Sequence, residues 1–169
     1  RNLVDSEVML GSLRDEGYEI ADEVGDGVDL FIVNTCSFVQ SAREESVDTI
    51  IEASQLKREG KIKRLMICGC LPQLYGKKLL KSLPEVDSIA GTSDIPKIAG
   101  IVKALLKDIP VSSVSKKLNY LYNENSPRFS LTPPHFAYLK ISEGCDNLCS
   151  YCIIPRLRGR FRSRPIESV

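Results

Sequence analysis

Hydrophobic residues form two kinds of pattern along the first part of the chain. Residues 30–33 and 65–68 are continuous apolar runs of strand length, and a shorter run covers Ser88–Ala90. Unbroken apolar runs, as opposed to alternating ones, are typical of strands that are covered on both faces of a parallel sheet. Between them lie longer segments whose apolar residues recur at helical spacing. The pattern therefore predicts β-α units on a parallel sheet.

Capping and breaking residues set the bounds of the predicted helices. Asn2 favours the start of a helix, with Asp5 in its first turn, and Gly17 favours its end. Gly60 and Pro84 favour the ends of two later helices. We therefore expect four helices, over residues 2–16, 42–57, 73–83 and 95–106. With the strands, they predict an α/β domain of flavodoxin-like topology.

The pattern changes after residue 107, so we place the first domain at 1–107. Residues 108–134 are rich in serine and proline and show little periodicity, which predicts a linker. We expect a strand over 136–141 and the start of a helix at Pro165, so that a second domain begins within 135–169. Because the sequence stops as that helix begins, we expect a truncated piece of a longer protein.

The composition narrows the class of protein. With 23 basic and 22 acidic residues, the net charge of +1 gives no general reason to expect binding to nucleic acid or membranes. No apolar run approaches the roughly 18 residues of a membrane span, and the chain does not open with a signal peptide. We therefore expect a cytoplasmic protein, in which clustered cysteines are metal ligands or buried thiols more often than disulfides.

Three of the six cysteines, Cys145, Cys149 and Cys152, lie in one short segment. Cysteine thiolates are the usual ligands of iron–sulfur clusters, and three on one loop can bind three corners of a [4Fe–4S] cluster. The fourth iron would stay open, which is typical of a catalytic metal position. Structural zinc sites favour two separated ligand pairs. Zinc and a disulfide knot remain the alternatives here.

A second set of cysteines follows the predicted strands. Cys36 comes after the run at 30–33, and Cys70 comes after the run at 65–68. The carboxyl ends of parallel strands form the edge at which α/β proteins bind ligands, so two thiolates there could share one ligand. Free cysteine is also among the most buried residue types, and the alternative is that both thiols simply pack. For Cys68, inside the strand, a buried thiol is the interpretation we adopt.

Basic residues recur at every second position after the cysteine loop. If this backbone were extended, five guanidiniums would share one face and could steer a polyanion such as RNA. The alternatives are a solvated surface, or internal pairing with acidic residues of the part of the second domain that this sequence does not include. These residues are Arg156, Arg158, Arg160, Arg162 and Arg164. The only histidine, His135, lies where a linker meets a strand, and we do not expect it to be catalytic.

The flanks of the cysteine loop carry a resemblance to a known family. Residues 137–144 lead into the loop, residues 153–165 follow it, and Tyr151 precedes the last cysteine. With the cysteine spacing, these blocks resemble the methylthiotransferases of the radical S-adenosylmethionine (radical SAM) superfamily. The resemblance implies that SAM binds the open iron and that Tyr151 packs beside the cluster and the SAM nucleoside. It also implies that the second domain is the start of a partial (β/α) barrel.

The same resemblance bears on the second cysteine set. Residues 34–36 and 69–73 resemble two ligand motifs of an auxiliary [4Fe–4S] cluster in the amino-terminal domain of that family. It implies that Cys36 and Cys70 are ligands of this cluster. The family's first ligand motif precedes a segment like residues 2–7 and is missing from this sequence, so two protein thiolates alone would hold the cluster weakly.

The resemblance also implies a reaction. Residues 3–7, 140–144 and 161–165 are closest to the branch that adds a methylthio group to the β-carbon of an aspartate in a small-subunit ribosomal protein. That branch uses two [4Fe–4S] clusters, SAM and a reductant protein. Such chemistry suits an unactivated C–H bond, which has no acidic proton and requires a radical cofactor.

Two alternative functions stay open. The sister branch of the family methylthiolates adenosine in transfer RNA. The chain could also be a non-catalytic iron–sulfur or zinc module that binds RNA through its arginine run. Because several SAM-contacting motifs of the family fall beyond Val169, we expect the present chain by itself to be inactive.

Overall fold

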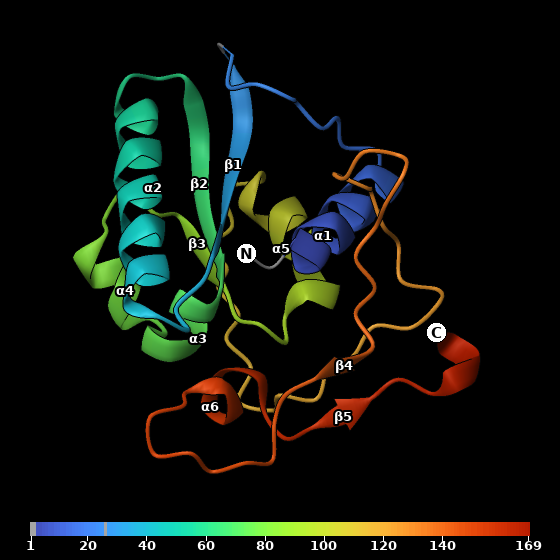
Figure 1. Ribbon diagram of the computed structural model, residues 1–169. Helices are drawn as coiled ribbons and strands as arrows, with labels where there is room; N and C mark the ends of the chain where they lie inside the picture. The colour runs from blue at the N-terminus through green and yellow to red at the C-terminus, as the bar shows by residue number, and fades with distance from the viewer. Residues whose placement is uncertain (1–2, 26) are drawn as a thin grey trace.

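The computed structural model describes residues 3–25 and 27–169, which form a parallel sheet between two layers of helices (Figure 1). The strands are β1 (Val28–Thr35), β2 (Ile62–Gly69) and β3 (Ser88–Ala90), paired in that order. On one face lie α1 (Leu3–Asp15) and α5 (Ile98–Leu105), and on the other lie α2 (Gln40–Arg58), α3 (Cys70–Tyr75) and α4 (Lys78–Ser82). The predicted α/β architecture with a parallel sheet is confirmed.

The central strand β2 explains why its apolar run is continuous. Leu65 and Ile67 pack in the core shared with α2, whereas Met66 and Cys68 pack in the core shared with α1 and α5. Each of these four side chains is at most 1% exposed. A strand that is buried on both faces needs apolar residues at every position, as the sequence pattern indicated.

Two predicted helices have the expected extent. α1 ends two residues before Gly17, whose positive φ of 85° and N–H bond to the carbonyl of Arg14 close the helix as a glycine cap. α2 covers the predicted 42–57 and adds a residue or two at each end. The proposed cap, Asn2, lies outside the described residues.

The single helix predicted over 73–83 is wrong. The chain forms two short helices, α3 and α4, because Gly76 between them adopts φ 57° and ψ −143°, which no α-helix contains. The helix predicted over 95–106 begins instead as a 3-10 turn, η1 (Ile95–Lys97), and continues as α5. Proline at its second position suits a helix start, where no N–H is needed.

Residues 108–134 contain neither a helix nor a paired strand, yet they pack closely. Ser113 forms a parallel bridge with Ala90 at the edge of β3, and the ring of Tyr122 is 5% exposed in the core beneath α1. Arg128 forms an ion pair with the buried Glu7 of α1. The predicted linker therefore packs across the α1 side of the sheet, and we call residues 108–134 the strap.

The strand predicted over 136–141 is wrong, whereas the helix expected to begin at Pro165 is present as a single 3-10 turn. Only β4 (Ser142–Glu143) pairs, antiparallel to β5 (Arg162–Ser163), so residues 136–141 have no neighbouring strand to complete a ladder. The segment holds α6 (Ile154–Arg158) and a closing 3-10 turn, η2 (Ile166–Ser168). No unit of a (β/α) barrel is complete within residues 135–169. None of the described helices is long and apolar enough to cross a membrane.

Candidate functional site

The carboxyl ends of β1 and β2 bring Cys36 and Cys70 to the same edge of the sheet, as predicted. Gly69, between β2 and α3, has φ 94° and lies so close to β1 that an added Cβ would be 2.6 Å from the carbonyl oxygen of Thr35. Cys36 is half-buried and Cys70 is buried. Burial raises the pKa of the Cys70 thiol, and Coulombic interaction with Cys36 adds to that rise.

Hydroxyl groups fix the backbone around both thiols. The backbone N–H of Cys36 donates to Ser46 Oγ, and this hydroxyl lies equally close, at 3.0 Å, to the carbonyl oxygen of Cys36. The hydroxyl of Thr35 donates to the carbonyl oxygen of Cys68 at 2.7 Å and accepts from the N–H of Leu71. These two hydroxyls therefore hold the backbone at this edge of the sheet. Their bonds are to backbone groups and not to the thiols.

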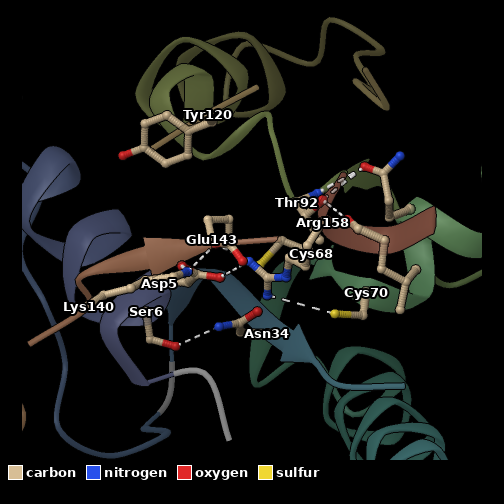
Figure 2. A network of polar contacts seen from close by, with 12 residues as sticks. Asp5, Ser6, Asn34, Cys68, Cys70, Thr92, Tyr120, Lys140, Glu143 and Arg158 are labelled. Carbon is tan, nitrogen blue, oxygen red and sulfur yellow. Dashed lines mark hydrogen bonds and ion pairs between the residues drawn. The ribbon is translucent and has the colours of Figure 1, made fainter. Parts of the chain in front are cut away.

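A buried cation completes this site (Figure 2). Arg158 of α6 is 5% exposed, and its Nη2 lies 3.8 Å from Cys70 Sγ. Its Nη1 donates to Asp5 Oδ2 at 2.7 Å and to Glu143 Oε2 at 3.2 Å. Lys140 forms ion pairs with both carboxylates. Two cations and two anions thus balance one another beside the Cys70 sulfur.

These surroundings act on the ionisable groups in opposite directions. Burial raises the pKa of the Cys70 thiol, and the charge and hydrogen bond of Arg158 partly offset that rise. Burial acts to lower the pKa of Arg158, but the charges of Asp5, Cys70 and Glu143 outweigh it and raise that pKa above its ordinary value. The Arg158 guanidinium therefore stays positively charged in contact with the Cys70 thiol.

No local pattern in the sequence indicated this network. Asp5 and Arg158 are 153 positions apart in the chain, and Tyr122, whose hydroxyl donates to Asp5, is 117 positions away. Asp5, Glu143 and Arg158 fall inside the segments that carry the family resemblance. Their place in these segments marked the three residues as candidates, but it did not show that they contact one another.

The loop with Cys145, Cys149 and Cys152 lies between β4 and α6. Its base is closed by the bond from the N–H of Cys145 to the carbonyl of Gly159, and the N–H of Cys152 donates to the carbonyl of Cys149. Cys149 is exposed and the other two thiols are half-buried. Tyr151 is 91% exposed. The thiols therefore occupy an open loop that incoming ligands can reach.

The structure does not gather these thiols into a formed site. Among residues 3–25 and 27–169, no three side chains of histidine, cysteine, aspartate or glutamate are grouped so as to hold a metal ion. The donors themselves fit an iron–sulfur cluster, since all three are free thiols on one accessible loop. Cys36 and Cys70 also fit as thiolate ligands, because the neighbouring cation favours negative charge on the buried sulfur.

The expectation that five arginines share one extended face is wrong. Helix α6 contains Arg156 and turns Arg158 inward to its buried carboxylates. Arg160 is exposed beside Asp146, with which it forms an ion pair of 3.3 Å. The other two, Arg162 and Arg164, donate to backbone carbonyls of the chain itself. Much of the run therefore bonds within this chain, to carboxylates and to backbone carbonyls.

Comparison with known proteins gives one family and a set of long relatives. Residues 1–91 match the Uncharacterized protein family UPF0004. The whole chain aligns with proteins named ribosomal protein uS12 methylthiotransferase RimO. It is 49% identical to that of Trichlorobacter lovleyi, 48% identical to that of Desulforamulus reducens and 44% identical to that of Clostridioides difficile. All of this chain is covered in each case, but only 37%, 38% and 38% of the relatives.

Proposed function

This chain belongs to the UPF0004 family, and we propose that the protein carrying it is a radical SAM methylthiotransferase acting on an aspartate of ribosomal protein uS12. The resemblance to methylthiotransferases that the sequence predicted is confirmed by its relatives. The substrate in the proposal comes from the names of those relatives, of which this chain spans little more than a third. The β-carbon of the aspartate is the proposed point of attachment.

The single observation that carries the proposal is the edge shared by Cys36 and Cys70. Two thiols at the carboxyl ends of neighbouring parallel strands, with Arg158 against one of them, are the arrangement expected of anionic ligands. We assign them to the auxiliary [4Fe–4S] cluster, and Cys145, Cys149 and Cys152 to the cluster that binds SAM. With SAM bound, such a cluster supplies a radical that can take hydrogen from an unactivated carbon.

Residues of this chain then have separate roles. Cys36 and Cys70 hold their sulfurs on a backbone fixed by the hydroxyls of Ser46 and Thr35. Tyr151 stands exposed beside Cys152, where it is available to contact the nucleoside of SAM. A reductant protein would meet the same open loop. Because the proposed substrate is a ribosomal protein, we place the enzyme in the cytoplasm.

Contact with ribosomal RNA is a smaller part of the proposal. Arg156 and Arg160 are the exposed members of the arginine run and are the ones we assign to it. Such contacts neutralise phosphates and would weaken as salt increases.

The substrate is tested by product mass. The full-length protein, purified without oxygen and given SAM and a reductant, is offered a uS12 peptide and, separately, transfer RNA. We expect an added methylthio group on the aspartate of the peptide and none on the RNA. Modification of adenosine instead would assign the enzyme to the sister branch.

The cofactors are tested by metal content. We expect the full-length protein to contain iron and acid-labile sulfide in equal amounts, and the combined Cys145→Ala, Cys149→Ala and Cys152→Ala variant to lose about half of each. Zinc without sulfide would contradict the radical mechanism and favour a zinc-binding module.

A further inference from the structure

Arg158 connects the two cysteine sets of the chain. It stands in α6, which directly follows the loop of Cys152, yet its guanidinium reaches Cys70 at the opposite set (Figure 2). Building on the proposed function, we propose that Arg158 is a positioning residue of the auxiliary cluster, which orients the Cys70 sulfur and keeps a positive charge beside the iron it binds.

The geometry leaves Arg158 little freedom. A guanidinium is planar, so fixing one of its nitrogens also fixes the direction of the others. Nη1 is held by Asp5 at 2.7 Å and by Glu143 at 3.2 Å, and both carboxylates are largely shielded, with side chains 1% and 14% exposed. Because these anchors come from α1 and β4, the Nη2 donor is aimed at Cys70 by two other elements of the fold.

The charges around Arg158 indicate that its contact with Cys70 does more than stabilise the fold. Arg158 and Lys140 already offset the charges of Asp5 and Glu143, so those four groups need no further partner. The donor that reaches Cys70 is directed at a thiol, which is a weak acceptor until it carries negative charge. A cluster sulfur ligand carries that charge, and hydrogen bonds to such sulfurs help to set the reduction potential of a cluster.

The test isolates the auxiliary cluster and then changes its neighbour. In the full-length protein carrying Cys145→Ala, Cys149→Ala and Cys152→Ala, iron and sulfide bound per chain are compared between the parent, Arg158→Lys and Arg158→Met. The reduction potential of the bound cluster is followed by electron paramagnetic resonance. Arg58→Met, which removes an exposed arginine of α2 that pairs with Glu85, is the matched control.

We expect Arg158→Met to lose iron several-fold and to shift the potential of the remaining cluster to more negative values, because the added electron loses its nearby cation. Arg158→Lys should restore the potential, since it keeps the charge, but should not restore full loading, since it lacks the fork that aims the donor. Arg58→Met should behave as the parent.

Other outcomes overturn the role of Arg158. If Arg158→Met only lowers the melting temperature and leaves the potential of the loaded cluster unchanged, the contact is merely structural. If the parent itself binds no iron through Cys36 and Cys70, the proposed function fails together with this role. Where Arg158→Met does not fold, Arg158→Gln, which keeps a planar polar group but removes the charge, is expected to shift the potential to more negative values as well, and no shift overturns the proposal.

Discussion

Gly69 decides how closely β1 and β2 approach at the edge that carries Cys36 and Cys70. Its φ of 94° is a conformation that residues with a Cβ rarely adopt, and a Cβ there would meet Thr35 O at 2.6 Å and Asn34 Oδ1 at 2.7 Å. Both neighbours belong to the end of β1. A glycine at this point is therefore a condition for bringing the two thiols together.

Replacing Gly69 with alanine should destabilise the protein. The backbone conformation alone costs roughly 1–2 kcal/mol, and the overlap with Thr35 adds to it. Urea unfolding measures the difference. Gly100→Ala is the matched control, because Gly100 lies exposed in α5 with nothing within 4 Å of an added Cβ, and there we expect a gain of about 0.5–1 kcal/mol. Equal effects at the two glycines would contradict this account.

Asp94 is a fully buried carboxylate that holds the strap of residues 108–134 to the sheet. It accepts hydrogen bonds from Lys97, Ser113 and Ser115. Burial acts to raise the pKa of Asp94, but the bonds from these three residues outweigh it and place that pKa below its usual value of 3.8. Folding is therefore linked to the ionised carboxylate.

Asp94→Asn should lower the free energy of unfolding at pH 7 by roughly 1–3 kcal/mol, because buried donors lose a charged acceptor. A lowered native pKa contributes stability that is complete above pH 3.8 and is lost as the pH falls through the native value. The difference between parent and variant should thus shrink below pH 3.8. Unfolding measured at several pH values checks this, with the exposed Asp48→Asn as control. A difference independent of pH would argue against it.

At the level of elements, only a narrow face of the helix α2 is buried against the sheet. Ile50 is 0% exposed and packs in the core with Leu65 and Ile67 of β2, whereas Ile51, its neighbour in sequence, is 51% exposed. Both were part of the apolar pattern that predicted the helix. Periodicity thus predicts that a helix forms, and packing determines which of its apolar residues support the core.

Ile50→Ala and Ile51→Ala form a matched pair. We expect the first to cost roughly 2–5 kcal/mol, since it leaves a cavity between α2 and the sheet. The second should change stability by less than about 0.5 kcal/mol, as surface substitutions do. Thermal and urea unfolding both report these values. A large loss at Ile51 would mean that this face of α2 is covered.

The elements that the sequence predicted correctly are those with strong local signals. The strands β1 and β2 each contain a continuous apolar run, at 30–33 and 65–68, and the apolar residues of α1 and α2 recur at helical spacing. The helix over 73–83 was wrong because Gly76 adopts φ 57° and ψ −143°, a conformation that glycine permits and that separates α3 from α4. The strand over 136–141 was wrong because a strand exists only with a partner, and a single sequence segment does not reveal whether a partner is available.

At the scale of the whole molecule, α1 is held by charges from distant parts of the chain. Glu7 is 0% exposed, and its carboxylate pairs with Arg128 and accepts the N–H of Leu131. Asp5 is held by Arg158 and Lys140. The segment that the sequence assigned to a linker therefore supplies part of the charge balance of the first layer of helices.

Glu7→Gln should loosen this strap. Replacing the charge weakens the bonds to Arg128 and Leu131, and we expect a loss of roughly 1–3 kcal/mol. Limited proteolysis should then cut faster within residues 123–136. Glu16→Gln, an exposed change just after α1, should leave both measures at the parent values. Unchanged cleavage in Glu7→Gln would show that the strap is held by its other contacts.

Part of the candidate site could be predicted from the sequence. Cys36 and Cys70 could be placed together because the carboxyl ends of parallel strands share an edge whatever the details of packing. The guanidinium of Arg158 could not be placed beside Cys70, since its position depends on α6 folding back across the sheet edge. The arginines at every second position suggested an extended segment, but Arg156 and Arg158 lie in the helix α6 and so do not share one extended face.

The pairing of α1 with residues so far along the chain has a consequence for biosynthesis. The 153 positions between Asp5 and Arg158 correspond to a delay of about 8–30 s at roughly 5–20 residues per second of translation. During that interval Asp5 lacks its bond to Arg158, so this contact of α1 forms only late in synthesis. Cys70 is made well before Arg158 as well. The contact between Arg158 and the Cys70 sulfur therefore also forms only after translation has passed Arg158.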